Sequence, residues 1–344
     1  MVIIGGRTEA APTRDTAPAS TRAYAAALAA GLVLLAAAAA ASLAIGTRQI
    51  PPGQVWHALA APTGTETDGI VRDLRLPRTL IGVAAGAALG LAGAVMQTLT
   101  RNPLADPGLL GVNAGASAAV ATAIGVLGVT GFTGYLWFAF AGAGLAAVLV
   151  TLLGGAEPVR LALAGTAVNA ALFGYVNGLQ LLDTGTLDAM RRWSVGALDG
   201  RRGGELAGAL PFLAAGAVLA LALARSLDAI ALGDDAARSL GAHPGRTRAL
   251  SVAAITLLTG GATAVCGPIA FVGLMVPHAV RPFTGAGARR LLPCCLVYAP
   301  VLLLASDIAG RVVTPPGEVE AGIVTAFLGG LLLVVLVRGK VVRP

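Results

Sequence analysis

The chain has 344 residues; 56% of them are hydrophobic, 12% are charged, and the mean hydropathy is +0.81. A soluble domain carries about twice this share of charged residues, so the composition excludes an ordinary soluble protein and indicates one embedded in a bilayer. The formal charge of +7 would suit a nucleic-acid partner, but the arginines lie between apolar runs and form no basic patch. Membrane topology explains them better, and we expect no nucleic-acid partner.

Apolar runs of membrane-spanning length recur along the chain. A membrane helix needs about 20 apolar residues, and that window predicts ten spans. They lie near residues 23–45, 79–99, 108–128, 132–153, 160–182, 204–224, 250–266, 269–283, 291–309 and 321–337. The first run is long enough to cross, so we interpret it as a retained helix rather than a cleaved signal peptide. Residues 1–22 and 339–344 are expected to be cytoplasmic tails, the first of them disordered, on either side of one transmembrane domain of residues 23–338.

The second predicted span carries Gly82, Gly86 and Gly90 at a strict spacing of four residues. Small residues at this spacing form a ridge on one side of a helix, where a neighbouring helix can approach closely. We therefore expect this span to pack tightly against another.

The predicted span at 269–283 is short and is broken by Pro277 and Pro282. With ten spans and a cytoplasmic N-terminus, 15 Lys and Arg residues lie inside and 9 outside; if 269–283 does not cross, the split becomes 10 against 14. The positive-inside rule therefore favours ten spans with both termini in the cytoplasm. A proline-broken segment at membrane depth must be buried in protein or line a cavity, because lipid cannot satisfy its freed carbonyls.

Motifs for enzymatic chemistry are missing from the sequence. It contains no GxxxxGK[ST] loop for nucleotide phosphates, no HExxH and no GxSxG. No Cys or His spacing suits zinc, since the three histidines are scattered and the cysteines lie in apolar runs: His57, His243, His278, Cys266, Cys294 and Cys295. We predict no catalytic residues, no metal site and no cofactor bound by this chain.

Acidic residues are nearly absent from the predicted spans, since only Glu205 and Asp307 lie within them, both near helix ends. Carriers driven by protons or ions usually keep carboxylates inside the membrane as relays. Their scarcity argues against self-powered secondary transport, although a sodium site built from carbonyl groups stays open.

Polar side chains line one side of the fifth predicted span. At 100° per residue, Thr166, Asn169, Asn177 and Gln180 share an arc of about 80°. Such a stripe is typical of hydrogen bonding between helices, worth about 0.6 kcal/mol per contact. It is equally typical of the wall of a wet pathway, and periodicity alone favours neither interpretation.

The loop 227–248 is predicted to contain a short helix of its own, Asp234–Leu240. Asp234 and Asp235 suit its positive N-terminal end, Arg238 is spaced to pair with Asp234, and Gly241 can end it in a left-handed conformation. Two turns of helix are unstable alone in water. The apolar side, which includes Ala237 and Leu240, must therefore pack on the chain's own surface or on a partner protein.

Arg75 and Arg78 flank Leu76-Pro77 just before the second span, on the predicted outer side. Arginines at this depth usually anchor a helix to lipid headgroups. The alternative is that they bind carboxylates of an outside partner, because a guanidinium group offers a bidentate fork.

Several motifs together resemble the FecCD-type permeases, the membrane subunits of ATP-binding-cassette (ABC) importers for iron–siderophore complexes, haem and vitamin B12. The resemblance covers about residues 25–338, in family order. It is carried by Arg75-Leu76-Pro77-Arg78, Gln97, Arg101-Asn102-Pro103-Leu104-Ala105-Asp106-Pro107, Leu110-Gly111, Arg160-Leu161-Ala162-Leu163-Ala164-Gly165, Trp193-Ser194-Val195-Gly196, Leu232-Gly233-Asp234, Ser239-Leu240-Gly241, Gly267-Pro268-Ile269-Ala270-Phe271-Val272-Gly273-Leu274, Pro277-His278, Arg281, Asp307, Arg311 and Glu318.

The resemblance implies an all-α polytopic protein with the type II ABC importer permease fold, in the bacterial cytoplasmic (inner) membrane. It implies a dimer with a second copy or a close paralogue, two ATPase subunits that hold ATP and Mg²⁺, and an extracytoplasmic substrate-binding protein. The substrate would be an iron–siderophore or a related metal chelate, translocated with no covalent chemistry.

The resemblance also assigns roles to residues at matching positions. Arg75, Arg78 and Arg311 look like the arginines that dock the binding protein. The element that contacts the ATPase corresponds to Gly233, Asp234, Asp235, Ala237, Arg238, Leu240 and Gly241. The translocation pathway corresponds to Gln97, Asn102, Thr166, Asn169, Asn177 and Gln180, which favours the wet-pathway interpretation of the stripe.

The chain departs from the family pattern in its last third, at Gly287-Ala288, at Val319-Glu320 and at Leu331-Leu332. These positions bear on the last two helix ends and on a subunit contact.

Two other classes of function are weighed against the importer. A polytopic membrane enzyme should bring carboxylates or histidines together at one cavity, and a secondary carrier should transport without an ATPase.

Overall fold

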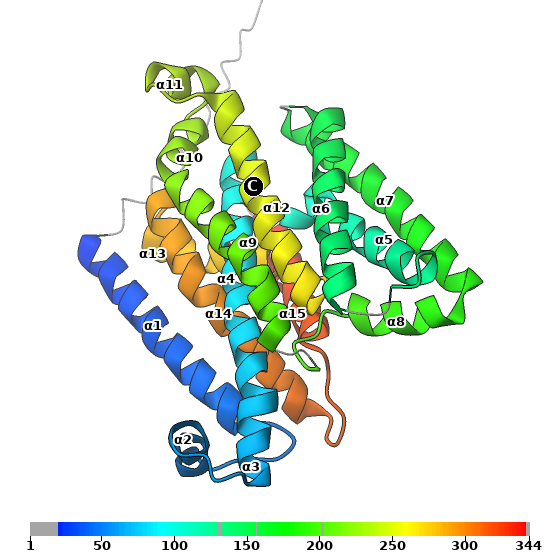
Figure 1. Cartoon of the computed structure of the whole chain (residues 1–344). Coiled ribbons are helices and arrows are strands. Elements are labelled where there is room, and N and C mark those ends of the chain that lie inside the picture. The colour runs from blue at the N-terminus through cyan, green and yellow to red at the C-terminus, as the bar shows by residue number, and fades with distance from the viewer. Residues whose placement is uncertain (1–19, 130–131, 156, 201–202, 342–344) are drawn as a thin grey trace, which may run out of the picture.

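A computed structural model describes residues 20–129, 132–155, 157–200 and 203–341, and every regular element in these ranges is helical (Figure 1). The predicted all-α class is confirmed. Most of the two predicted tails, residues 1–19 and 342–344, lies outside the described residues.

Seven described helices are long and apolar enough to cross a membrane. They are α1 (Thr21–Ala44), α4 (Leu76–Thr100), α6 (Phe132–Gly154), α7 (Pro158–Leu182), α9 (Gly203–Ala222), α12 (Pro244–Cys266) and α14 (Ala288–Val313). Each overlaps a predicted span. α4 is the last part of a continuous helical run that begins at Glu66, passing through α3 (Glu66–Gly69) and the π-helical turn η1 (Ile70–Arg75).

The other three predicted spans are shorter helices or shorter apolar stretches. α5 (Val112–Gly125) and α13 (Val272–Thr284) have 14 and 13 residues, which is roughly 20 Å against the roughly 30 Å of a hydrocarbon core. In α15 (Ala321–Val341), the apolar stretch is Ala321–Leu336. The run 108–128 was predicted as one span, but Gly111 adopts a positive φ of 73° and separates the turn η2 (Pro107–Leu110) from α5.

Four short helices surround the long ones. α2 (Pro52–Ala60) and α8 (Thr184–Ser194) were not predicted, and neither was α10 (Ala224–Ala231). The predicted helix in the loop 227–248 is confirmed as α11 (Asp234–Ser239), one residue shorter than expected. Figure 1 places α11 at one end of the bundle and α2, α3 and α8 toward the other; these are called the α11 end and the α2 end below.

α4 lies at the centre of the bundle and packs against α14, α12 and α13. The predicted glycine ridge is confirmed. A methyl group on Gly86 would come within 2.6 Å of Pro300 Cα, and one on Gly90 within 2.4 Å of Ala299 Cβ, both on α14. Because these glycines have no side chain, the backbones of α4 and α14 can touch there.

The proline-broken segment is confirmed as a short buried helix. α12 ends at Cys266, and α13 begins at Val272 after Phe271, which has a positive φ of 68°. α13 contacts α4 and α14, and Val272 through Pro277 are buried. Protein therefore surrounds the broken backbone, as the membrane requires.

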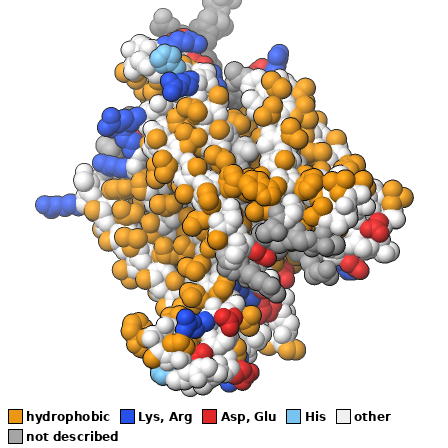
Figure 2. Space-filling view, viewed as in Figure 1, with side chains coloured by type: hydrophobic (Ala, Val, Ile, Leu, Met, Phe, Trp, Pro, Cys, Tyr) orange, Lys and Arg blue, Asp and Glu red, His pale blue; other side chains and the backbone are white. Residues whose placement is uncertain are grey.

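The surface between the two ends is apolar. Figure 2 shows hydrophobic side chains over the middle of the molecule, while charged side chains gather toward the ends. Large exposed side chains include Val33 on α1 and Leu145, Leu149 and Leu152 on α6. A belt of this kind is expected where lipid replaces water.

Candidate functional site

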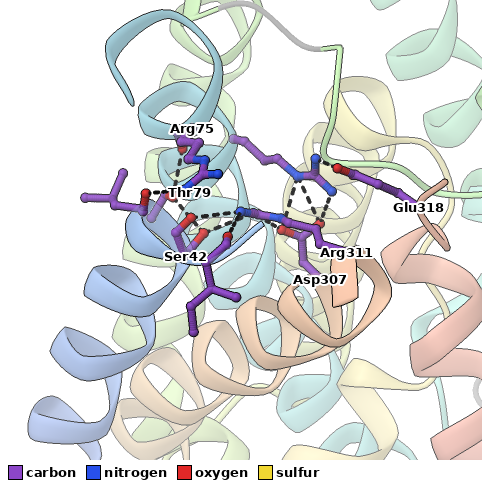
Figure 3. Close-up of polar contacts among 9 residues, drawn as sticks. Ser42, Arg75, Thr79, Asp307, Arg311 and Glu318 are labelled. Carbon is purple, nitrogen blue, oxygen red and sulfur yellow. Dashed lines mark hydrogen bonds and ion pairs between the residues drawn. The ribbon is translucent and has the colours of Figure 1, made fainter. Parts of the chain in front are cut away.

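Each end of the bundle carries a cluster of arginine and carboxylate side chains. At the α2 end, Arg75, Arg78, Asp307, Arg311 and Glu318 form what we call the arginine cluster (Figure 3). At the α11 end, Arg101, Asp234 and Arg248 form the Asp234 cluster.

Arg75 and Arg311 turn inward and cap the C-terminal end of α1. Arg75 Nη1 donates to the carbonyls of Leu43 and Ala44, both at 2.8 Å. Arg311 Nη1 donates to the carbonyls of Ser42 at 2.8 Å and Ile45 at 3.2 Å. The last turn of a helix leaves four carbonyls unpaired and has a partial negative charge, so two guanidinium groups stabilise it well.

Arg78 and Asp307 form the charged centre of the arginine cluster. Arg78 Nε lies 3.1 Å and Nη2 2.8 Å from Asp307 Oδ1, and Asp307 also contacts Arg311. The Asp307 side chain is only 1% exposed. A buried carboxylate must be paired, and here one carboxylate serves two arginines. Arg78 Nη1 lies 2.7 Å from Glu318 Oε2, which compensates part of the remaining positive charge.

The three arginines expected to dock the binding protein are therefore close together, and two of them face the protein interior. Arg75 and Arg311 are 7% and 2% exposed and direct their guanidinium groups into the protein, because the end of α1 lies against them. Arg78 is the most accessible of the three, with a side chain that is 11% exposed. The sequence alone does not reveal this orientation, because the same residue pattern fits an arginine that faces a helix end and one that faces water.

A cavity of about 790 Å³ opens beside the arginine cluster. Its lining includes Arg72, Arg78, Asp73, Asp199 and Glu318. A second cavity of about 640 Å³ shares Asp199 and is lined by Glu320, one of the departures from the family pattern. Burial, the charge of Asp199 and a hydrogen bond with Asp199 raise the pKa of Glu320 to about 7. Acidic and basic groups thus meet at this end of the molecule.

In the Asp234 cluster one carboxylate again serves two arginines. Arg248 Nη2 lies 2.8 Å and 2.9 Å from the two Asp234 oxygens, and Arg101 Nη2 lies 3.0 Å from Oδ1. The hydrogen bond from Arg248, with the charges of Arg248 and Arg101, holds the pKa of Asp234 below its usual range. The predicted pair between Arg238 and Asp234 is wrong, because Arg238 Nη1 contacts Asp235 Oδ1 at 2.7 Å instead.

α11 carries a buried apolar side chain, and the residue that directly follows it carries an exposed one. Ala237 is fully buried within this chain, whereas Leu240 is 66% exposed. The two glycines that flank the helix, Gly233 and Gly241, adopt positive φ values of 112° and 78°, and the predicted left-handed end at Gly241 is confirmed. The sequence left open whether this helix packs on its own chain or on a partner protein. Both are partly met, because the helix packs on its own chain through Ala237 and presents Leu240 outward.

The polar stripe lies on α7, at the flank of the bundle opposite α1 (Figure 1). Asn169 is half-buried, and its Nδ2 donates to the carbonyl of Gly108 at 3.1 Å. Thr166 and Asn177 are exposed, and Gln180 is half-buried. One member of the stripe therefore serves helix packing, while Thr166 and Asn177 present polar side chains that other parts of this chain do not cover.

Gln97 and Asn102 differ from the stripe in their placement. Gln97 is 1% exposed, and Arg281 Nη2 donates to its Oε1 at 2.8 Å. Gln97 lies on α4, and in this chain α13 encloses its side chain; its role in a pathway stays a prediction. Asn102 is exposed, and its Oδ1 accepts a hydrogen bond from the Leu104 amide at 2.9 Å, which forms the turn after α4.

Within the described residues, no three His, Cys, Asp or Glu side chains are grouped to hold a metal ion. Cys266, Cys294 and Cys295 are free and buried. The geometry at both ends is that of ion-pair clusters placed at helix ends.

A family model described as "FecCD transport family" matches residues 34–339 of this chain. The ferric enterobactin transport system permease protein FepD of Escherichia coli is 48% identical over 315 residues, covering 90% of this chain and 94% of that protein. The iron(3+)-hydroxamate import system permease protein FhuB of Bacillus subtilis is 38% identical over 311 residues, covering 88% and 80%.

A solved structure described as an inward-facing conformation of a metal-chelate type ABC transporter has the same fold. Its TM-score to this chain is 0.80 at 27% sequence identity, and the match covers 92% of this chain and 99% of that one. The chain therefore shares both its sequence and its architecture with these transport proteins.

Proposed function

Because this chain belongs to the FecCD transport family, we propose that it imports a ferric siderophore or a related metal chelate as the permease subunit of an ABC importer. The observation that carries the proposal is the 48% identity to a ferric enterobactin permease over nine-tenths of the chain. The apolar belt and the long apolar helices support a multi-pass protein of the cytoplasmic membrane.

The proposed topology has ten crossings or partial crossings, with both termini in the cytoplasm. Seven long helices together with α5, α13 and α15 supply the ten elements. On the face shown in Figure 2, Lys and Arg side chains predominate at the α11 end and acidic side chains gather at the α2 end. The positive-inside rule then supports a cytoplasmic α11 end.

Two copies, or this chain and a close paralogue, would enclose the pathway between their α7 helices. The exposed polar face of α7 supports this arrangement, because Thr166 and Asn177 have no cover within the chain. Single cysteines at these positions should react with water-soluble thiol reagents in at least one nucleotide state. Protection in every state would assign the stripe to helix packing.

The α2 end would receive the substrate-binding protein. Arg78 supports this because it is the most accessible arginine of its cluster and its outer partner, Glu318, has a side chain that is 28% exposed. A carboxylate of the binding protein could take the place of Glu318 on Arg78 Nη1. Arg75 and Arg311 would act indirectly, by holding the end of α1 beside the docking surface.

The α11 end would receive the ATPase subunits, which would carry ATP and Mg²⁺. The exposed side chains of Leu240 and Leu232, at 66% and 69%, support a contact with another protein, since they are large and apolar on a charged surface. ATP binding would then shift the permease between at least two conformations.

Reconstitution tests the proposal. The chain is co-purified with its ATPase and binding protein, placed in liposomes, and supplied with radiolabelled ferric enterobactin. Uptake should require ATP and the binding protein and should stop when the ATPase is removed. Uptake that continues without an ATPase would establish a secondary carrier instead.

A further inference from the structure

The Asp234 cluster ties the start of α11 to the end of the central helix α4. Arg101 follows the last residue of α4, and its side chain contacts both Asp234 and the carbonyl of Ile230 at the end of α10, each at 3.0 Å. Arg101 has a positive φ of 52°, one of two non-glycine residues in this conformation among the described parts of the chain. Such strain persists only where surrounding contacts enforce it.

One turn earlier on α4, Gln97 joins that helix to α13. Pro277 has no amide hydrogen, so the carbonyl of Gly273, four residues before it, loses its helical donor. Gln97 Nε2 lies 3.3 Å from this oxygen and 3.3 Å from the carbonyl of Leu274. Arg281, in the last turn of α13, donates to Gln97 Oε1 at 2.8 Å. A single amide therefore contacts both ends of the broken helix.

The two helices also touch through their backbones at this level. A methyl group on Gly93 would lie 1.9 Å from the carbonyl oxygen of Gly273. Closely packed backbones cannot slide past one another without losing this fit, because protein interiors deform little. A displacement of the end of α4 must therefore be passed to α13.

We propose that Arg101 and Gln97 are positioning residues which transmit movement of α11 to the broken helix α13 through the end of α4. This rests on the proposed function, in which α11 contacts the ATPase. Asp234 links α11 to Arg101, the last turn of α4 links Arg101 to Gln97, and Gln97 holds the carbonyl that Pro277 leaves free. Arg248 joins Asp234 to α12 as well, so α11 is held to both α4 and α12, which pack against each other.

The second non-glycine residue with a positive φ supports the same route. Phe271 is the residue immediately before α13. Its ring packs against Gly329 of α15, where an added methyl group would lie 2.2 Å from Phe271 Cγ. Strained residues thus stand at both ends of the path, at Arg101 and at Phe271. Strain of this kind is concentrated at segments that switch conformation.

The experiment compares R101Q, Gln97→Leu and the double variant in the reconstituted complex. It measures ATPase co-purification, the basal rate of ATP hydrolysis, and ferric enterobactin taken up per ATP hydrolysed. Each single variant should retain its ATPase and basal hydrolysis but lose at least about fivefold in uptake per ATP, the lower end of measured coupling between sites. The double variant should be no worse than either single one, because both interrupt one path.

R289Q is the matched control, because Arg289 also sits at the α11 end and pairs with an aspartate, Asp228, at 3.8 Å, but it lies on α14 and is not part of the Asp234 cluster. It should leave uptake per ATP unchanged. R101K keeps the charge that faces Asp234 and should recover part of the uptake per ATP that R101Q loses.

Three results would overturn the proposal. They are an unchanged uptake per ATP in R101Q, a double variant whose loss is the product of the single losses, or release of the ATPase by R101Q. None of them would contradict the import function itself, which is tested by the requirement for an ATPase in the unaltered complex.

Discussion

The arginine cluster at the α2 end and the Asp234 cluster at the α11 end are built from the same parts but differ in burial. Each places one aspartate between two arginines. Asp307 and Arg311 are 1% and 2% exposed, whereas Asp234, Arg101 and Arg248 are 31%, 44% and 27% exposed. Buried charges are costly to separate, while partly exposed ones exchange partners with water at little cost. The first arrangement suits a fixed helix end and the second a contact that moves.

Removing the shared carboxylate at the buried end should have the largest effect. Asp307→Ala leaves Arg78 and Arg311 without their common partner, which should destabilise the fold by about 3–5 kcal/mol. A thiol-reactive dye can follow thermal unfolding, because all three cysteines are buried. Asp188→Ala, at an exposed aspartate of α8, should leave the transition unchanged. Equal transitions for the two variants would mean that the buried cluster contributes no more than a surface charge.

At the exposed end, a change should act on a partner rather than on the fold. Leu240→Asp alters a side chain that this chain leaves uncovered, so unfolding should be unaffected. Binding of the ATPase should weaken by about 2 kcal/mol or more, roughly thirtyfold, as at the centre of other protein interfaces. Leu240→Met keeps the apolar contact and should retain the ATPase. If Leu240→Asp purifies with a full complement of ATPase, α11 does not form the contact.

The pH response of the α2 end should come from Glu320. Because folding raises its pKa to about 7, the folded chain binds the proton more tightly than the unfolded chain. Stability from this group is therefore full below the unfolded pKa of about 4.5 and declines as the pH rises toward 7. Glu320→Gln, which can donate to Asp199 at any pH, should remove that decline from thermal unfolding measured between pH 4.5 and 8. A variant with the pH profile of the natural chain would contradict the assignment.

The smallest effect should be that of salt on docking. The ion pair between Arg78 and Glu318 is partly exposed, so an intermolecular pair at the same place should be worth at most about 1 kcal/mol. Binding of the substrate-binding protein, measured by titration, should weaken a few-fold between low and physiological salt, and Arg78→Ala should lose most of that dependence. Docking that is indifferent to both salt and Arg78→Ala would place the contact elsewhere.

The parts of the fold that follow from local chemistry were predictable. Glycine spacing identified a helix in close contact with a neighbour, which is α14, and Pro277 identified a segment that had to be buried in protein or line a cavity. The span at 108–128 was overestimated because hydropathy does not detect a left-handed glycine such as Gly111. The short helices α2 and α8 were missed because each is too brief for a membrane-length window.

The candidate sites were only half predictable, because side-chain direction depends on distant neighbours. Arg75 and Arg311 were correctly placed at one end of the molecule, but the carbonyls they cap belong to α1, more than 30 and 260 residues away in the chain. Asp234 was expected to pair within its own helix and instead pairs with arginines that follow α4 and lie on α12. No spacing rule within a helix detects such partners.

The π-helical turn Ile70–Arg75 sets how the α2 end is oriented about the axis of α4. A π-turn holds more residues than an α-turn, so residues before it are rotated relative to those after it. Within the turn, Val71 packs into the small apolar cluster with Ile50, Val55 and Ala58, while Ile81, after the turn, enters the main core. If the same six residues formed a plain α-helix instead, everything before the turn would be rotated by about 100°. The surface helices α2 and α3 would then have to pivot around the bundle to keep Val71 covered, so the length of this turn determines which way the outer cap of the protein faces.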